Sequence, residues 1–175
     1  PPTSKQGVSS AASDVYKRQL PALMPTHPAP SFRPGSIVRV ACEHFVTYDA
    51  VEFRPGPHLN MIVGPNGTGK STVVCAIALG LGWKPSVLGR AKDVASYVKL
   101  GHSQGWVEIE LQGTESNVTI RRILFRESNT SDWMLQGVPA SARQVHQAVS
   151  QFNIEVGNLC AFLPQDRVAD FAAMT

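Results

Sequence analysis

The residues best suited to chemistry lie between positions 59 and 72, in the tract LNMIVGPNGTGKST. The tract fits the pattern G-x-x-x-x-G-K-[ST], in which a loop turns its backbone N–H groups toward a polyphosphate. Glycine suits such a loop because it has no side chain to keep the backbone away from the anion. The residues predicted to contact the phosphates are Gly64, Pro65, Asn66, Gly67, Thr68, Gly69, Lys70, Ser71 and Thr72.

Two of these residues have separate predicted roles. The Lys70 ammonium is expected to reach the β- and γ-phosphates, and the Ser71 hydroxyl to take one coordination position on Mg²⁺. A charge-assisted hydrogen bond contributes about 1.5–3 kcal/mol, so loss of Lys70 should weaken binding about ten- to a hundredfold. The alternative is a glycine-rich turn that binds nothing.

The loop needs a strand before it and a helix after it. An apolar run over 61–63 precedes it and another over 73–81 follows it, which predicts a strand over 59–63 and a helix over 70–81. The helix is apolar nearly all round, as expected of a helix buried against a sheet, and Gly82 is its predicted C-cap. Its positive N-terminal end would face the anion.

Further strands are expected on both sides of this unit, over 37–45, 51–53, 106–111, 118–125 and 133–136. The last three would form an antiparallel meander. Ile120 and Ile123 fall on opposite faces of their strand, so a bulge there is a further expectation.

The C-terminal third predicts a capped helix. Ser141 and Gln144 form a capping-box pattern, and an apolar face follows at positions 142, 145, 149 and 152. A short apolar strand is expected over 159–163, with a helical pattern after it.

The 175 residues are 43% hydrophobic and 17% charged, as in an ordinary globular protein. The net charge of +3 is carried by residues 1–33, so the pI of about 9.0 does not indicate a nucleic-acid-binding fold. Residues 1–34 are proline-rich and predicted to be a disordered tail, and the tract over 8–19 resembles a translated sequencing adaptor. The ordered domain is expected over 35–175.

Other composition signals are mostly negative. The longest apolar run, 73–83, is about half the length of a membrane span, so no membrane segment is expected. The three cysteines, Cys42, Cys75 and Cys160, have no metal-site spacing and predict buried thiols.

Three segments together resemble the ATPase heads of the structural maintenance of chromosomes (SMC) family: LNMIVGPNGTGKSTVVCAIALGLGWKP, GRAKDVASYVKLG and GNLCAFLPQDRVADF. The resemblance covers about 35–175 and implies an α/β fold, a P-loop NTPase of the ABC-ATPase type, of which this chain is the N-terminal half with an antiparallel β-meander. It also implies that Gln165 is the Q-loop residue that contacts Mg²⁺ and the attacking water. Arg90 matches an arginine that approaches nucleotide or DNA.

The same resemblance implies ATP and Mg²⁺ as cofactors and a role in chromosome maintenance and recombinational repair in the nucleus. The implied partners are the sister SMC protein six, non-SMC element subunits including a kleisin, and DNA. No Walker B strand or LSGG-like signature is found in the sequence. We therefore expect weak nucleotide binding and no hydrolysis by this chain alone. A transporter-type ABC domain, a non-catalytic DNA-binding or scaffold module, and a small P-loop kinase are the alternatives.

Weaker candidates lie outside the loop. Arg121, Arg122 and Arg126 could neutralise DNA phosphates, but Glu108 and Glu110 on the neighbouring predicted strand could pair with some of them, and pairing is favoured.

Tyr48 could stack on an adenine, although packing is the more common use of such an aromatic side chain. The histidines have no metal-site spacing.

Overall fold

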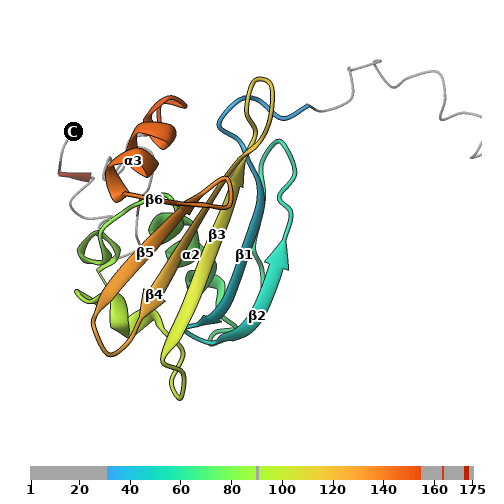
Figure 1. Ribbon diagram of the computed structural model, residues 1–175. Helices are drawn as coiled ribbons and strands as arrows, with labels where there is room; N and C mark the ends of the chain where they lie inside the picture. The colour runs from blue at the N-terminus through green and yellow to red at the C-terminus, as the bar shows by residue number, and fades with distance from the viewer. Residues whose placement is uncertain (1–30, 90, 155–162, 164–171, 174–175) are drawn as a thin grey trace, which may run out of the picture. The chain divides into compact units, whose positions relative to one another are not determined.

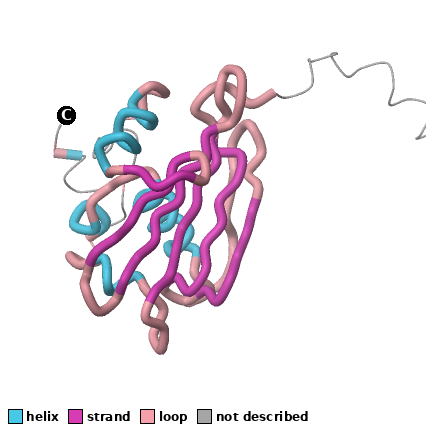
Figure 2. Tube along the Cα trace, viewed as in Figure 1, coloured by secondary structure: helices cyan, strands magenta, loops and turns pink. Residues whose placement is uncertain are grey.

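The computed structural model describes residues 31–89, 91–154, 163 and 172–173. The chain divides into two units, 1–31 and 32–175, and every element below belongs to the second. Its central feature is one six-stranded sheet in the order β2-β1-β3-β4-β5-β6, with every neighbouring pair antiparallel (Figures 1 and 2). The strands are β1 (Ile37–Phe45), β2 (Tyr48–Phe53), β3 (Gln104–Leu111), β4 (Val118–Phe125), β5 (Thr130–Leu135) and β6 (Val138–Ala140).

The sheet buries one face because its strands alternate. In β3, Val107, Ile109 and Leu111 are fully buried. Their register partners in β1 are apolar, and so are those of Ile109 and Leu111 in β4, whereas Val107 lies opposite Arg122 of β4. The three predicted strands of the meander and the two predicted strands before the loop are confirmed, and β4 has the predicted bounds. The short strand β6 was not predicted.

Helix α2 (Lys70–Gly80) packs on this face against β1, β3 and β4. A Cβ on Gly80 would lie 2.5 Å from Ile109 Cγ1, so only glycine permits this close approach of helix and sheet. The helix ends in a Schellman motif, in which Trp83 N donates to Ala78 O and Gly82 N donates to Leu79 O. The predicted helix and its glycine terminator are thus confirmed to within one residue.

Short helices complete the unit: the 3₁₀ helices η1 (Pro85–Leu88) and η2 (Val94–Tyr97), and helix α3 (Ala142–Ser150). The predicted capping box of α3 is present, because Gln144 N donates to Ser141 Oγ and Ser141 N donates to Gln144 Oε1. Val145 and Val149 are fully buried as predicted, whereas Ala142 is exposed and the prediction for it was wrong.

The predicted strand over 59–63 is not formed. Leu59, Met61 and Val63 are 92%, 76% and 77% exposed, and the segment has no strand assignment. A strand requires a neighbour to satisfy its backbone N–H and C=O groups, and no strand of the described residues pairs with this segment. The apolar side chains of this segment are therefore exposed in the structure.

The predicted bulge in β4 was also wrong. The register of β4 is unbroken against both β3 and β5, and the irregularity in the sheet falls in β1, between Ile37 and Arg39. The inward position between Ile120 and Leu124 is taken by Arg122, although an arginine side chain is ordinarily exposed to solvent.

Two predictions fall mainly outside the described residues: the strand over 159–163, of which only Leu163 is described, and the helical pattern after it. Cys42 and Cys75 are buried as predicted, whereas Cys160 is outside the described residues. Within the described part of the chain, no helix is long and apolar enough to cross a membrane.

Candidate functional site

The phosphate loop leads directly into α2. Gly67 and Gly69 have φ of 86° and 91°, in the left-handed region that glycine adopts without strain. Gly69 is the N-cap of α2, no side chain caps the helix, and its first turn has no acidic residue. The first N–H groups of a helix have no partner within the helix, so this end is suited to receive an anion.

Lys70 lies at the mouth of the loop. Its Nζ donates to Gly64 O and to Pro65 O, both at 2.7 Å, which folds the side chain back over the loop. Thr68 Oγ1 donates to Pro65 O at 2.9 Å and ties the two sides of the loop together. Ser71 is exposed in the first turn of α2.

The turn between β1 and β2 forms the opposite wall of a cavity of about 320 Å³ next to the loop. The lining residues are Val46, Thr47, Asn66, Gly67, Gly69, Lys70, Ser71 and Thr72. Thr72 is buried, and its hydroxyl lies 3.4 Å from the Thr47 hydroxyl. Val46 and Thr47 were not predicted as site residues, because no spacing rule links them to a loop about 20 positions later.

Tyr48 contacts the loop by its hydroxyl. Tyr48 Oη donates to Gly69 O at 2.9 Å, and a Cβ on Gly69 would lie 2.7 Å from Tyr48 Oη. Burial raises the pKa of Tyr48, so the phenol remains a donor at neutral pH.

These groups fit a magnesium-bound polyphosphate. The lining supplies backbone N–H groups, hydroxyls and one ammonium, and none of its described residues carries a carboxylate to repel phosphate. Six of the nine predicted loop residues line the cavity, whereas Gly64, Pro65 and Thr68 are not among its described lining.

The three arginines considered for DNA are engaged within the fold. Arg121 Nε donates to Glu108 Oε2 at 2.6 Å, and its guanidinium lies 4.3 Å from the Trp106 ring centroid. Arg126 donates to the carbonyls of His102 and Val98. The ion-pair interpretation is thus confirmed for Arg121.

Arg122 is buried under the sheet. Its Nη1 donates to Leu79 O at 3.2 Å and to Trp83 O at 3.1 Å, at the C-terminal end of α2, and its Nε donates to Ser131 Oγ at 3.0 Å. Burial lowers the pKa of Arg122 to about 10, so the guanidinium keeps its charge at neutral pH.

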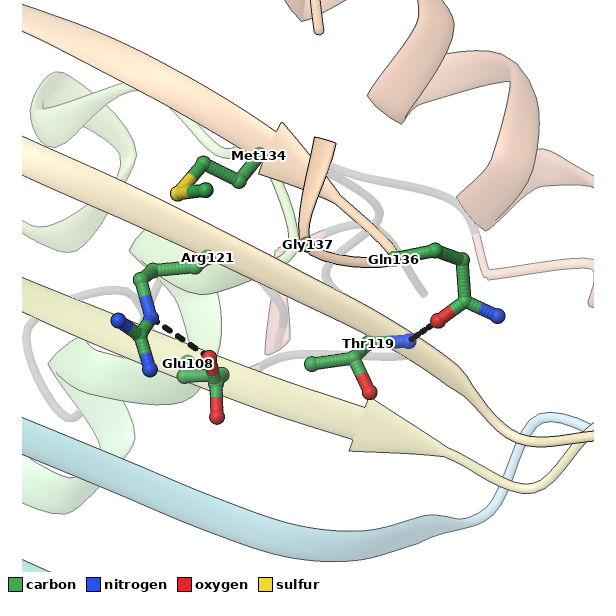
Figure 3. Close-up of a pocket in the computed structure, with 6 residues that line it drawn as sticks. All are labelled: Glu108, Thr119, Arg121, Met134, Gln136 and Gly137. Carbon is green, nitrogen blue, oxygen red and sulfur yellow. Dashed lines mark hydrogen bonds and ion pairs between the residues drawn. The ribbon is translucent and has the colours of Figure 1, made fainter. Parts of the chain in front are cut away.

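A second cavity, of about 380 Å³, lies on the other face of the sheet (Figure 3). Figure 3 shows Arg121 and Glu108 turned toward one another, and Gln136 turned toward Thr119, whose N–H donates to Gln136 Oε1 at 3.0 Å. Arg39 joins this network through Glu108 and Glu110. The charges here neutralise one another, so this face gives no reason to expect an anionic partner.

Two predicted site residues, Arg90 and Gln165, lie outside the described residues. The rings of His44 and His102 stack at 3.7 Å, and no group of three or more metal-binding side chains occurs among the described residues.

Comparison with known proteins agrees with this fold. A family model described as an AAA domain matches residues 39–175. Solved structures of SMC heads superpose with a TM-score of 0.72 at 22% identity, over 79% of this chain and 92% of the other, and of 0.71 at 21% identity, over 79% and 47%. The second of these heads was solved bound to the C-winged helix domain of ScpA. The fold and the loop thus define a P-loop NTPase domain of the SMC-head type, which confirms the predicted fold class.

Relatives with closer sequences identify the family. Structural maintenance of chromosomes protein 5 of Arabidopsis thaliana is 46% identical over 82% of this chain, and that of Schizosaccharomyces pombe is 45% identical over 80%. Protein 6B of Arabidopsis thaliana is 27% identical over 78%. The chain belongs to the structural maintenance of chromosomes family and corresponds to the N-terminal part of the head of protein 5. It spans about 14% of the length of these relatives.

Proposed function

We propose that the chain is the ATP-binding half of an SMC head. The main support is the arrangement around the loop: an uncapped helix N-terminus, two glycines in the left-handed region, and the Lys70 ammonium 2.7 Å from the carbonyls of Gly64 and Pro65. A nucleotide triphosphate would enter the cavity between this loop and the β1–β2 turn.

Within this proposal, residues 64–72 hold the phosphates, with Lys70 on the β- and γ-phosphates. Ser71 and Gln165 would hold Mg²⁺, which would neutralise charge on those phosphates. Gln165 would also orient the attacking water, and Arg90 would approach nucleotide or DNA. The domain would span 35–175, after a disordered tail over 1–34.

The uncovered segment over 59–63 supports a head completed by a distal half. Met61 and Ile62 also line a cavity of about 530 Å³, together with Ile37, Phe53 and Ile77. An apolar segment without strand partners favours burial by added strands, and each buried CH₂ contributes about 0.8 kcal/mol. We therefore expect ATP hydrolysis only when the distal half and a partner head are present.

The biological setting is proposed from the similarity to protein 5. The completed head would hydrolyse ATP to organise DNA in chromosome maintenance and in double-strand break repair by recombination, in the nucleus and on chromosomes. Its partners would be SMC protein six, non-SMC element subunits including a kleisin, and DNA. The ScpA-bound head among the structural neighbours supports a kleisin-type partner.

A purely DNA-binding module is less well supported. The arginines that could carry such a function, Arg121, Arg122 and Arg126, donate to a carboxylate or to backbone carbonyls.

Titration with a fluorescent ATP analogue tests nucleotide binding. The Lys70→Ala variant should bind about ten- to a hundredfold more weakly than wild type, since it loses a charge-assisted contact. Lys84→Ala is the matched control, because Lys84 is exposed beyond the C-terminal end of α2 and should leave binding unchanged. Equal binding by wild type and Lys70→Ala would refute the proposed site.

The need for a partner is tested with complete heads. A non-hydrolysable ATP analogue should cause this head to co-purify with the head of SMC protein six, and omission of the analogue should abolish the association. Steady-state ATP turnover by the present chain alone, lost in Lys70→Ala, would contradict the proposed division of the active site.

A further inference from the structure

We propose that Tyr48 is a positioning residue for the phosphate loop. Its hydroxyl fixes the carbonyl of Gly69 and thereby the direction of the Lys70 N–H that faces the phosphates. This inference rests on the proposed nucleotide site and assigns to Tyr48 a role different from adenine stacking.

The hydrogen bond acts on one peptide group. Gly69 O accepts from Tyr48 Oη at 2.9 Å, and it also accepts from Thr72 N at 2.8 Å and from Val73 N at 3.3 Å in the first turn of α2. In a planar trans peptide, the C=O of one residue and the N–H of the next point in opposite directions. A fixed Gly69 carbonyl therefore holds the Lys70 N–H on the loop side of the peptide.

The anchored residue is the one with the most freedom. Gly69 has φ of 91° and is the N-cap of α2, and it has no side chain of its own to cap the helix. Glycine explores a wider range of backbone conformations than any other residue, so an external contact has most effect here. The Tyr48 ring supplies that contact, because a Cβ on Gly69 would lie 2.9 Å from Tyr48 Cζ and 3.0 Å from Cε1.

Tyr48 is itself held by the sheet. It is the first residue of β2 and pairs with Phe45, which is fully buried at the end of β1. Between them, Val46 N donates to Tyr97 O at 2.9 Å, and Phe45 forms a bridge with Val98. The Tyr48 hydroxyl thus links the sheet directly to the loop, in addition to the packing of α2 on the sheet.

Two variants separate positioning from stacking. Tyr48→Phe removes only the hydroxyl and keeps an aromatic ring that can stack on a base, whereas Tyr48→Leu removes both. Positioning requires that Tyr48→Phe weakens binding about two- to tenfold, the usual effect of one hydrogen bond. It also requires the same loss for inorganic tripolyphosphate, which has no base.

The measurement is isothermal titration of the purified chain with ATP·Mg²⁺ and with tripolyphosphate, beside urea unfolding of the ligand-free variants. Tyr97→Phe is the control, since it removes the hydroxyl of a tyrosine whose ring stacks on Phe45, and it should bind both ligands as wild type does. Equal losses for both ligands in Tyr48→Phe and Tyr48→Leu support positioning.

Four outcomes overturn the inference. Wild-type affinity in Tyr48→Phe with a loss only in Tyr48→Leu, and only for ATP, would assign Tyr48 to base stacking. Lower unfolding free energy in Tyr48→Phe with unchanged affinity for both ligands would make the hydroxyl purely structural. If wild type and Lys70→Ala bind ATP equally, both the proposed nucleotide site and this inference are wrong. If Lys70→Ala weakens ATP binding but Tyr48→Phe does not, only this inference is wrong.

Discussion

Arg122 should be a main support of the phosphate-loop helix, although it lies at the opposite end of α2 from the loop. It is only 7% exposed, and no carboxylate of the described residues forms an ion pair with it. Its guanidinium instead binds Leu79 O and Trp83 O and lies 4.6 Å from the Trp133 ring centroid. A cation at the C-terminal end of a helix also stabilises the helix dipole.

Arg122→Met isolates the hydrogen bonds, because methionine fills most of the same space. Leu79 O keeps the hydrogen bond from Gly82 N, but Trp83 O loses its Arg122 donor. A hydrogen bond from a charged group contributes about 1.5–3 kcal/mol, and its loss is partly offset by relief of the desolvated charge. Arg122→Ala adds a cavity, so we expect a loss of about 1–3 kcal/mol for methionine and about 3–5 kcal/mol for alanine.

Urea unfolding followed by tryptophan fluorescence measures these losses, with the m-value as a check on two-state behaviour. Arg143→Met on the exposed face of α3 is the control and should change the unfolding free energy by less than about 0.5 kcal/mol. If Arg122→Met is as stable as wild type or more stable, burial of the charge outweighs its hydrogen bonds, and Arg122 does not anchor the helix.

Two further predictions concern the sheet. Burial would raise the pKa of Glu108, but hydrogen bonds from Arg39 and Arg121 outweigh it and hold that pKa below its ordinary 4.5. The stability that Glu108 contributes is therefore present above about pH 4.5 and is lost as the pH falls through the lower pKa of the folded state. In urea unfolding measured across this pH range, Glu108→Gln should lose less stability at acid pH than wild type does. The same loss in both proteins would contradict the ion-pair network. Burial also raises the pKa of Cys42 to about 11, so peptide-resolved alkylation at pH 8 should label Cys42 only after unfolding, and rapid native labelling would show that β1 opens.

Sequence patterns predicted the elements whose cause is local. The capping box of α3 depends on Ser141 and Gln144 alone, and β3 shows its buried face by strict alternation. The burial of Arg122 could not be predicted this way, because its position matches the inward face but its charge favours solvent. Its partners, the carbonyls of Leu79 and Trp83, lie about 40 positions away and meet it only after α2 packs on the sheet.

The candidate site divides in the same way. The loop and Lys70 follow from the motif, and their backbone geometry agrees with it. The contacts of Thr47 and Tyr48 depend on the register of β1 with β2, which brings the turn between them to the loop. Composition and spacing do not predict that register. From the sequence alone, Tyr48 could therefore either stack on a base or pack within the fold.

The two sides of the phosphate loop are supported unequally, and this gives a structural reason to expect weak binding by the chain alone. The helix side is held by Tyr48 at the loop, by packing of Gly80 on Ile109, and by Arg122 at the far end. The entering side is held by a local turn, in which Asn60 bonds the backbone of positions 56 and 58, and by Lys70 and Thr68, which donate to carbonyls of positions 64 and 65. A phosphate that binds must order this second side itself, and fixing each backbone residue costs about 1–2 kcal/mol. Strand pairing over 59–63 in a complete head would remove that cost before the nucleotide arrives.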